Sequence, residues 1–481
     1  MKNIFSLFAI VLVTTIMGLL QGCRSTYHSP VPLLIDTGSN TESISTEART
    51  ISLKPGEKLS LDDAIRIARQ NNPSLAAVQL RVAQAAAVLR HVQAMRGPQL
   101  SLTGLAGHYS DAERVAPPDH NGEPGVFAKD ILGTELILSY PLYTGGVLEA
   151  NERANRALLN ASQYRYLRAQ HELCFNVSKV FTDILARRSY LESLQYNLKA
   201  MQSHLARVSE LIVAQKAREL DRTRIKVRIS DLQQKIIQTR NDLAVMNTVL
   251  ANLMGVKDTS FEVVGELQSN PLQYPQKDQE SLIQEAYSNR EDLAALQEEL
   301  NAQMRKVEAV QGEIRPQVAM FAGYGVRTGL NPDDEPSGTD RTDSRGRIGL
   351  SVSIPIWDSG LRKAKIDQAQ AGLVALQKQV TAARQRVRME IRTALLNLNS
   401  ARERVRTSQS VVEQAREVLA VQQTSHRLGK ATLTDVLEAQ SALFAAQANY
   451  VAALAKLRIA AAELELASGG NFMIKNEVQK K

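Results

Sequence analysis

The sequence contains little cysteine and few large aromatic residues. Among its 481 residues are two cysteines, one tryptophan and nine phenylalanines. Two cysteines cannot supply the disulfide framework of a small secreted protein. So few large aromatic side chains also argue against one large conventional globular core. Length alone would allow several domains, so the organisation of the chain must be read from its patterns.

Patterns that carry catalysis or metal binding are missing as well. The chain has no glycine-rich phosphate loop with its lysine, which argues against an ATPase. Its seven histidines are scattered, and none lies beside a second His or Cys at metal-ligand spacing. The formal charge of +8 is spread along the chain and does not form the basic stripe that nucleic-acid binding requires. We therefore expect no enzyme, no cofactor, no metal site and no nucleic-acid partner.

The first residues have the pattern of a secretory signal. Lys2 precedes an apolar run from Ile4 to Leu20, which leads directly into Leu-Gln-Gly-Cys, ending at Cys23. This resembles a bacterial lipobox, in which the chain is cleaved before the cysteine and the cysteine is acylated. We expect residues 1–22 to be removed and Cys23 to carry lipid such as palmitate, with Arg24 favouring the outer membrane. The alternative is an ordinary signal peptide or an anchor helix with a chance cysteine.

The rest of the chain contains an internal repeat. One constant spacing of 214 residues relates landmarks that are spread over more than a hundred residues, which indicates a duplicated unit. The matched pairs are Pro141 and Pro355, Tyr143 and Trp357, Gly146 and Gly360, Asp221 and Asp435, and Gly255 and Gly469.

Both copies carry apolar residues at every seventh position. In the second copy they are Ile391, Leu398, Val405, Val412 and Leu419, and in the first Val177, Ile184, Leu191, Leu198 and Leu205. A sustained seven-residue period predicts helices that supercoil by knobs-into-holes packing. At about 1.5 Å per residue, an arm from Leu361 to Leu428 reaches roughly 100 Å. Such an arm has no interior of its own and must pack on its return arm and on neighbouring chains.

Each long helical pattern follows two strand patterns. The predicted strands span about 99–109, 131–140, 317–327 and 346–354, with alternating apolar residues. Runs of about 9–11 residues are long enough to cross a bilayer when tilted, and alternation suits a wall with lipid on one side and water on the other. Four strands with open edges cannot lie in lipid, because unpaired backbone groups are costly there. The strands must therefore close into a barrel with other copies.

Several short segments carry a family resemblance by their order, spacing and duplication. They are Asn71–Leu75, Pro141–Gly146, Leu253–Gly255, Pro355–Gly360, Arg427–Gly429, Asp435–Leu437 and Ala467–Gly469. With these segments, residues 60–469 resemble the TolC-like outer-membrane efflux protein family, the outer-membrane factors. The resemblance implies a mainly α fold with a small β part. As a homotrimer, the duplicated strand–strand–long-helical-hairpin unit would form a twelve-stranded outer-membrane β-barrel continuous with a periplasmic α-helical barrel.

The resemblance also suggests how the chain is divided. The expected segments are a signal peptide (1–22), a lipidated leader (23–59), a first repeat (60–255, hairpin 146–254), a linker (256–280), a second repeat (281–469, hairpin 360–468) and a tail (470–481). The implied function is an exit duct of a tripartite efflux or type I secretion system in a Gram-negative outer membrane. Its implied partners are a periplasmic adaptor and an inner-membrane transporter of the RND or ABC type.

The resemblance places the entrance gate at the helical tips. Asp435 and Glu438 match acidic residues that line the family's entrance constriction, where three copies would ring a narrow pore. Asp221 holds the equivalent place in the first repeat, but Arg224 stands where Glu438 has its counterpart. We hypothesise that Arg222 or Arg224 pairs with Asp435 or Glu438 and helps to hold the entrance shut. The alternative is that these are solvated charges on helix faces.

The same tips would form the adaptor-docking surface. Its expected residues are Gly429 and Lys430 in the second repeat and Gln215 and Lys216 in the first. Gln215 replaces the glycine of the second tip, a departure from the repeat pattern. Two other functions stay open at this point, a periplasmic adaptor lipoprotein and a structural coiled-coil protein. The two strand hairpins at matched positions argue against both.

Overall fold

The computed structural model describes residues 56–116, 126–215, 218–257, 259–267, 278–330, 332–334 and 342–470, all within one compact unit, Ser52–Lys481. The first half contains β1 (Lys58–Leu59), α2 (Leu61–Asn71), α3 (Pro73–Ala94), β2 (Gln99–Ala116), β3 (Val126–Tyr143), α4 (Val147–Val213) and α5 (Glu219–Met254). The second contains β4 (Glu262–Val263), α6 (Gln279–Asn289), α7 (Glu291–Gly312), β5 (Gln317–Gly329), β6 (Pro332–Asp334), β7 (Thr342–Ser353), α8 (Leu361–Arg427) and α9 (Leu433–Ala467).

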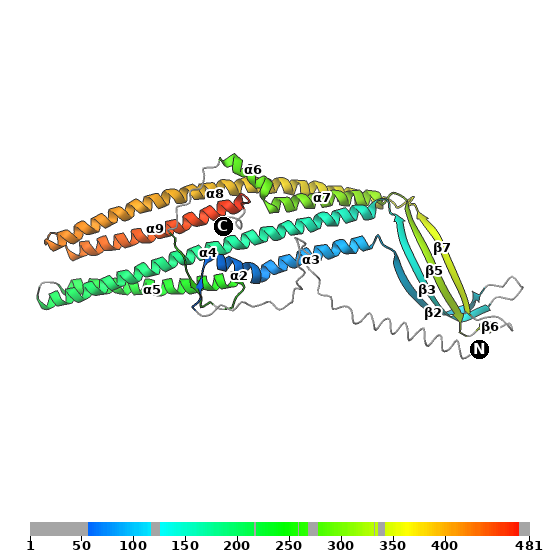
Figure 1. Ribbon diagram of the computed structural model, residues 1–481, viewed down its shortest axis with the longest axis horizontal. Coiled ribbons are helices and arrows are strands. Elements are labelled where there is room, and N and C mark those ends of the chain that lie inside the picture. Colours follow the sequence, from blue (N-terminus) through cyan, green and yellow to red (C-terminus); the bar gives the residue numbers. More distant parts are fainter. Residues whose placement is uncertain are drawn as a thin grey trace, which may run out of the picture. The chain divides into compact units, whose positions relative to one another are not determined.

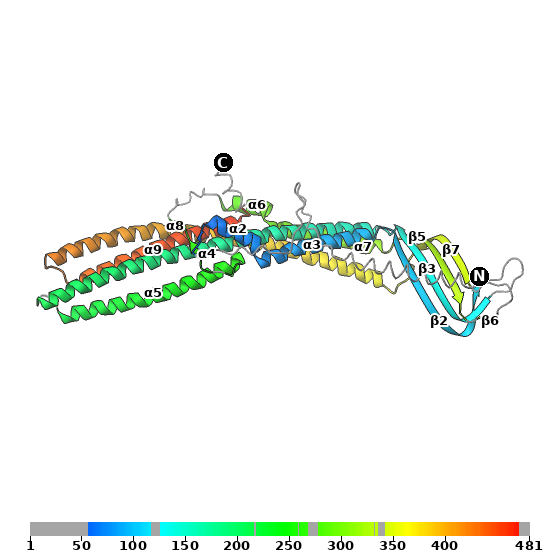
Figure 2. The same ribbon diagram turned by 60° about the horizontal axis from the view of Figure 1, so that its bottom comes forward.

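The duplicated unit predicted from the sequence is visible as two antiparallel helix pairs. α5 returns along α4, and α9 returns along α8 (Figures 1 and 2). The shorter α3 packs on α4, and α7 lies against both α4 and α8. Helices dominate, and one larger sheet follows them at the end away from the tips (Figure 1). The predicted fold class, mainly α with a small β part, is confirmed.

The seven-residue pattern marks the buried seam of each pair. Val177, Ile184, Ile391 and Leu398 are all almost fully buried. The small residues of the second copy, Ala394 and Ala401, lie in the same core cluster, where they allow close approach of the helix axes. Because both long helices present this seam to their neighbours over many turns, tertiary packing rather than helix propensity stabilises them.

Matching glycines start the two long helices. Gly146 and Gly360 have φ of 87° each, in the left-handed region that favours glycine. The residues before them differ. Gly145 has φ of 68° and a Cβ built there would lie 2.4 Å from the carbonyl oxygen of Gly312, whereas the equivalent Ser359 adopts φ of 53° with a side chain present. The first strand–helix corner is therefore the tighter of the two.

The two returning helices are fastened by different residues at equivalent places. In the first half, Asn72 donates from Nδ2 to the carbonyl of Leu253 at 2.8 Å and accepts from the amide of Leu75 at 2.9 Å. In the second half, the buried Arg290 donates to the carbonyl of Ala467 at 3.2 Å. Both side chains satisfy a carbonyl in the last turn of a helix, which has no partner within the helix itself.

Arg290 additionally joins two other helices by ion pairs. Its guanidinium donates to Glu390 of α8 at 2.7 Å and to Asp292 of α7 at 2.7 Å. Burial raises the pKa of Asp292, but the hydrogen bond and charge of Arg290 outweigh it, so the pKa lies below its usual value. The junction of α6, α7, α8 and α9 thus rests on a charged network, whereas the Asn72 junction uses uncharged hydrogen bonds.

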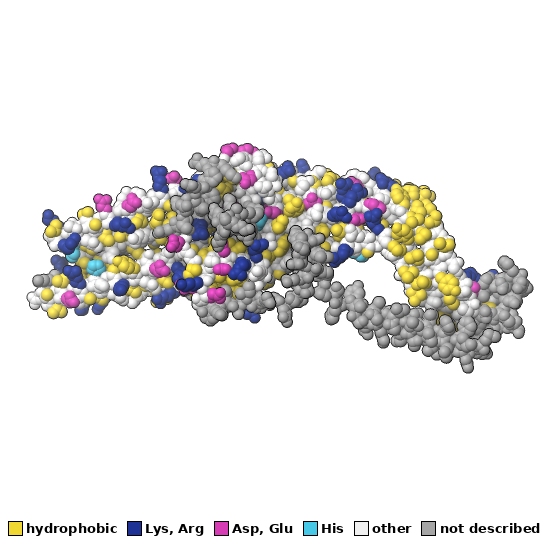
Figure 3. Space-filling view, in the orientation of Figure 1, with side chains coloured by type: hydrophobic (Ala, Val, Ile, Leu, Met, Phe, Trp, Pro, Cys, Tyr) yellow, Lys and Arg dark blue, Asp and Glu magenta, His cyan; other side chains and the backbone are white. Residues whose placement is uncertain are grey.

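The larger sheet is antiparallel, in the order β2–β3–β5–β7, with β6 paired to β3. Its strands extend beyond the predicted ranges, because the ladder continues into segments expected to be loops: Thr328 pairs with Thr342, and Ala116 with Val126. Each outer strand, β2 and β7, has one edge without a partner in this sheet. Hydrophobic side chains gather on the surface of this sheet (Figure 3).

The predicted linker, 256–280, contains structure that its sequence did not indicate. β4 pairs in parallel with β1 from the predicted leader, joining the start of one half to the start of the other. Arg188 of α4 binds Glu262 of β4 at 2.7 Å. Strands of two residues have no periodicity to detect. No helix among the described residues combines the length and apolar character needed to cross a membrane.

Candidate functional site at the helical tips

The two helix-to-helix turns lie at the same end of the described helices (Figure 1). α8 ends at Arg427 and is followed by Gly429, whose φ of 71° lets the chain reverse. α4 ends at Val213, and Gln215 takes φ of 60° in place of a glycine. Of the expected tip positions, Gly429 and Gln215 therefore have left-handed backbone. Lys216 and Cys23 lie outside the described residues.

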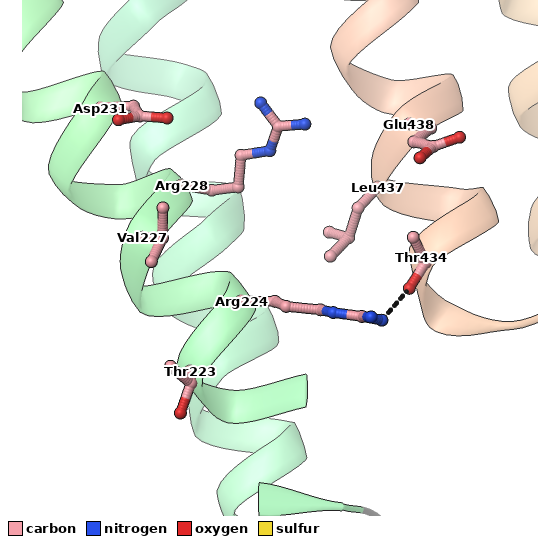
Figure 4. Close-up of a pocket in the computed structure, with 8 residues that line it drawn as sticks. All are labelled: Thr223, Arg224, Val227, Arg228, Asp231, Thr434, Leu437 and Glu438. Atoms are coloured by element: carbon pink, nitrogen blue, oxygen red, sulfur yellow. Dashed lines mark hydrogen bonds between the residues drawn. The ribbon is translucent and has the colours of Figure 1, made fainter. Parts of the chain in front are cut away.

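A groove between α5 and α9 lies next to these turns. It encloses about 350 Å³ and its walls are formed by Thr223, Arg224, Val227, Arg228, Asp231, Thr434, Leu437 and Glu438 (Figure 4). Its floor is apolar, because Leu437 is buried in a core cluster with Ile225. Charged residues of both signs line its walls at one-turn spacing, with Arg224 and Arg228 on α5 and Glu438 on α9.

Arg224 crosses the groove and joins the two helices. Its Nη1 donates to the hydroxyl of Thr434 at 2.9 Å (Figure 4). Arg222 instead pairs with Glu219 within its own helix, α5. In the part of the chain that the structure describes, neither arginine forms an ion pair with Asp435 or Glu438. We had expected Arg222 or Arg224 to pair with Asp435 or Glu438, whereas within one chain the partner of Arg224 is Thr434.

Asp435 has another partner because it caps its own helix. Its Oδ2 accepts from the amide and the hydroxyl of Thr432, at 2.7 Å each, while Thr432 accepts from the Asp435 amide at 3.2 Å. The hydroxyl and amide of Thr432 lower the pKa of Asp435 below its usual value. Its carboxylate is therefore charged at neutral pH, and it turns back toward the tip. Asp221 lies in the first turn of α5, as its match to Asp435 predicts.

Two histidines, His204 and His426, lie on the helices that lead to the tips. His426 directs Nδ1 to the carbonyl of Ala431 at 3.0 Å, across the turn. Burial lowers the pKa of His204 on α4, and the charges of Arg207 and His426 act in the same direction. No group of His, Cys, Asp and Glu among the described residues is arranged to hold a metal ion. The arrangement is thus suited to holding helices together and to presenting charge.

Sequence reasoning missed Thr434, Arg228 and Asp231 as groove residues. The only available signal was helical spacing, since Thr434 and Glu438 are four residues apart, as are Arg224 and Arg228. That spacing puts each pair on one helix face but does not say which faces oppose each other.

Comparison with known proteins finds one family model that matches both halves of the chain. The family model described as "Outer membrane efflux protein" matches residues 64–256 and 282–470. The chain is similar to outer membrane protein TolC of Vibrio cholerae, at 21% identity over 386 residues, covering 79% of this chain and 84% of the relative. It is also similar to the pyoverdine export outer membrane protein OpmQ of Pseudomonas aeruginosa, at 23% identity over 400 residues with 80% of each covered.

Solved structures agree on the fold. The outer membrane protein VceC of Vibrio cholerae superposes with a TM-score of 0.70 at 19% identity, over 86% of this chain and 96% of that one. Because the family model covers both repeats, the periplasmic-adaptor alternative no longer holds. With its duplicated strand and helix units, the chain belongs to the outer membrane efflux protein family.

Proposed function

We propose that three copies of this chain form one tube, the outer-membrane exit duct of a tripartite export system. The observation that carries the proposal is the larger sheet, in which the four long strands β2, β3, β5 and β7 have an apolar exposed face and the two outer strands each have an edge without a partner in this sheet. Lipid cannot satisfy the backbone groups of an open edge, so such a sheet is stable there only when closed. Joining β7 of one copy to β2 of the next closes it, giving twelve strands from three copies.

The helices support the same assembly. Apolar residues remain exposed along α8 and α5 in the single chain, among them Met389, Leu396 and Val418 on α8 and Ile237 and Val245 on α5. Neighbouring copies would cover these residues and extend the sheet into a helical tube. Transport through the tube is passive, and an inner-membrane transporter of the RND or ABC type, joined through a periplasmic adaptor, supplies the energy.

The adaptor would dock at the turns between the long helices. Gly429 and Lys430 lie at one turn and Gln215 at the other, and we include Lys216 in the docking surface from its place in the sequence. Asp435, Glu438 and Asp221 would contribute acidic groups near the entrance, which favour cations and slow anions in a narrow pore.

Fractionation and gel migration test the assembly. The protein should sediment with outer membranes and run as a trimer in SDS without heating and as a monomer after boiling. Purified in detergent, it should insert into planar bilayers and conduct ions. A stable detergent-free monomer without conductance would overturn the proposal.

Replacing Arg224 by alanine tests the entrance. Because the Arg224–Thr434 bond joins α5 to α9, its loss should loosen the closed tips and raise single-channel conductance or open probability severalfold. A hydrogen bond from a charged group contributes about 1.5–3 kcal/mol net to stability, and the exposure of this bond to solvent reduces that contribution. Thr434→Ala should act similarly, and the double variant should add little.

Arg222→Ala is the matched control. Arg222 has the same charge and lies on the same helix, but its ion pair stays within α5. An equal rise in conductance for Arg222→Ala and Arg224→Ala would show that positive charge, rather than the bond across the groove, controls the entrance.

Acylation of Cys23 is tested by labelling. Cells fed radioactive palmitate should label the wild-type protein, and Cys23→Ser should remove the label. Cys174→Ser is the control, because Cys174 is buried and burial raises its pKa to about 11, which leaves it unreactive. An equal amount of label in Cys23→Ser and wild type would exclude lipid attachment at this residue.

A further inference from the structure

The register of the sheet assigns its side chains to two faces. Directly paired residues lie on the same face, so Leu102, Leu136 and Tyr324 share one face, as do Leu100, Leu138 and Ile348 one row away. The exposed apolar members of this face are Leu100, Leu102, Leu132, Leu136, Tyr324, Ile348, Leu350 and Val352. In a membrane-inserted barrel this face meets lipid, so the opposite face lines the interior.

The opposite face is built mostly from small, polar and charged residues. Its paired rows are Gln99, Ser139, Phe321 and Gly349; Ser101, Ile137, Gly323 and Arg347; and Thr103, Glu135, Gly325 and Arg345. Ile137 and Phe321 are the apolar members of these rows. The charges are concentrated on the strand residues nearer the loops.

One ion pair on this face spans three strands. Arg347 of β7 donates from Nη2 to Oε1 of Glu135 on β3 at 2.6 Å, passing over β5. β5 has glycines at both crossing rows, Gly323 and Gly325. A Cβ built on Gly323 would lie 2.9 Å from Glu135 Oε1 and 3.2 Å from Arg347 Nε. The missing side chain is therefore what allows the pair to form.

An aromatic ring holds the same guanidinium from another side. The Arg347 Cζ lies 5.9 Å from the ring centroid of Phe321, a favourable cation–π distance. The ring in turn covers Gly349, where an added Cβ would lie 2.8 Å from Phe321 Cζ. Three glycines thus provide the space in which Arg347 is held between a carboxylate and a ring.

Arg347 nevertheless stays open on its remaining side. Its side chain is 60% exposed, and that of Glu135 is 33% exposed. A guanidinium carries five donors in a planar fork, and Glu135 takes only Nη2. Two further pairs, Arg345 with Asp343 and Arg327 with Glu113, continue the charged band toward the loops. The guanidinium donors of Arg347 therefore point toward the space that the closed barrel would enclose.

We propose that Arg347, positioned by Glu135 and Phe321, is a contact site for carboxylate or phosphate groups of cargo passing through the strand portion of the duct. This inference rests on the proposed function, because the interior face exists only in the closed assembly. Held between the Glu135 carboxylate and the Phe321 ring, the planar guanidinium matches an oxyanion without having to be ordered when cargo arrives. Glu135 limits how strongly cargo is held, because it competes for the same donors, so anionic cargo can leave.

Single-channel recording with citrate as the probe tests this site. Citrate is added on the side of the bilayer reached by the strand loops, and block of the current is measured as a function of its concentration. Wild-type channels should be blocked, and Arg347→Gln should need several times more citrate. Arg347→Lys keeps the positive charge but loses the planar, forked set of donors, so citrate should block this variant to an intermediate extent. Glu135→Gln should strengthen the block and shift the reversal potential in a KCl gradient toward chloride.

Two glycine variants separate the geometry of the site from its charge. Gly323→Val keeps both charges but fills the space between them, so citrate block should weaken while the trimer still forms. Gly104→Ala is the control, because it lies on the apolar face and an added Cβ meets nothing within 4 Å. Equal citrate block in wild type, Arg347→Gln and Gly323→Val would overturn the inference. A wild-type protein that forms no conducting trimer would overturn the proposed function instead.

Discussion

Replacement of Gly145 by valine is expected to prevent accumulation of the assembled trimer. The left-handed backbone at this position costs a residue with a side chain about 1–2 kcal/mol. In addition, a Cβ would lie 2.4 Å from the carbonyl oxygen of Gly312, a backbone atom that no rotamer change can move. The corner between β3 and α4 would have to separate from the end of α7. Unheated gels of outer membranes should show at least about a tenfold loss of trimer, equivalent to more than about 1.4 kcal/mol.

Gly360→Ala is the matched control for the Gly145 variant. Gly360 also has a left-handed backbone, with φ of 87°, but nothing lies within 4 Å of an added Cβ. This variant therefore carries the backbone strain without the overlap, and most of the trimer should survive. Similar losses in both variants would mean that strain alone, and not the contact with Gly312, limits this corner.

Replacement of Arg290 by methionine is expected to destabilise the second half of the protein by about 2–4 kcal/mol. Arg290 is 3% exposed, and its removal leaves Asp292, Glu390 and the Ala467 carbonyl without their shared donor. The value lies below that of a fully buried pair because the two carboxylates are 38% and 37% exposed, so water screens them. Thermal unfolding followed by circular dichroism measures the loss. Arg66→Met, which breaks an exposed pair with Asp63, should change little.

The Arg290 variant should also alter the pH dependence of stability. Because the pKa of Asp292 is lowered in the folded protein, its contribution is present above the unfolded value of 3.8 and is lost as pH falls through the lower folded value. Methionine removes the cation that lowers this pKa. The difference in stability between wild type and variant should therefore be largest at neutral pH and shrink below about pH 4. A constant difference down to pH 3 would show that lost packing, and not the ion pair, accounts for the effect.

Much of the fold could be predicted because its sequence patterns extend over many residues. A seven-residue period sustained over many turns and a constant spacing of 214 residues are hard to produce by chance, and the buried seam through Ile184 and Ile391 follows them. Strand ends were less predictable, since pairs such as Thr328 with Thr342 depend on the partner strand and not on local alternation. The β1–β4 contact was invisible for the same reason.

At the helical tips, the hydrogen-bond partners could not be predicted from the sequence. Duplication placed Asp435 and Arg224 near the two neighbouring tips, but in the structure Asp435 accepts from Thr432 while Arg224 donates to Thr434. The Glu135–Arg347 pair lies 212 positions apart in the chain and forms only because β5 has a glycine between them. Such contacts depend on sheet register, and the alternation within one strand does not show which residues of the next strand it pairs with.

The unequal fastening of the two returning helices has a consequence for how the duplicated arms respond to their surroundings. Strong acid should weaken the junction around Arg290, because it protonates Asp292, whereas the hydrogen bonds of Asn72 involve no group that titrates. The two junctions, which hold equivalent places in the repeat, should therefore respond differently to strong acid.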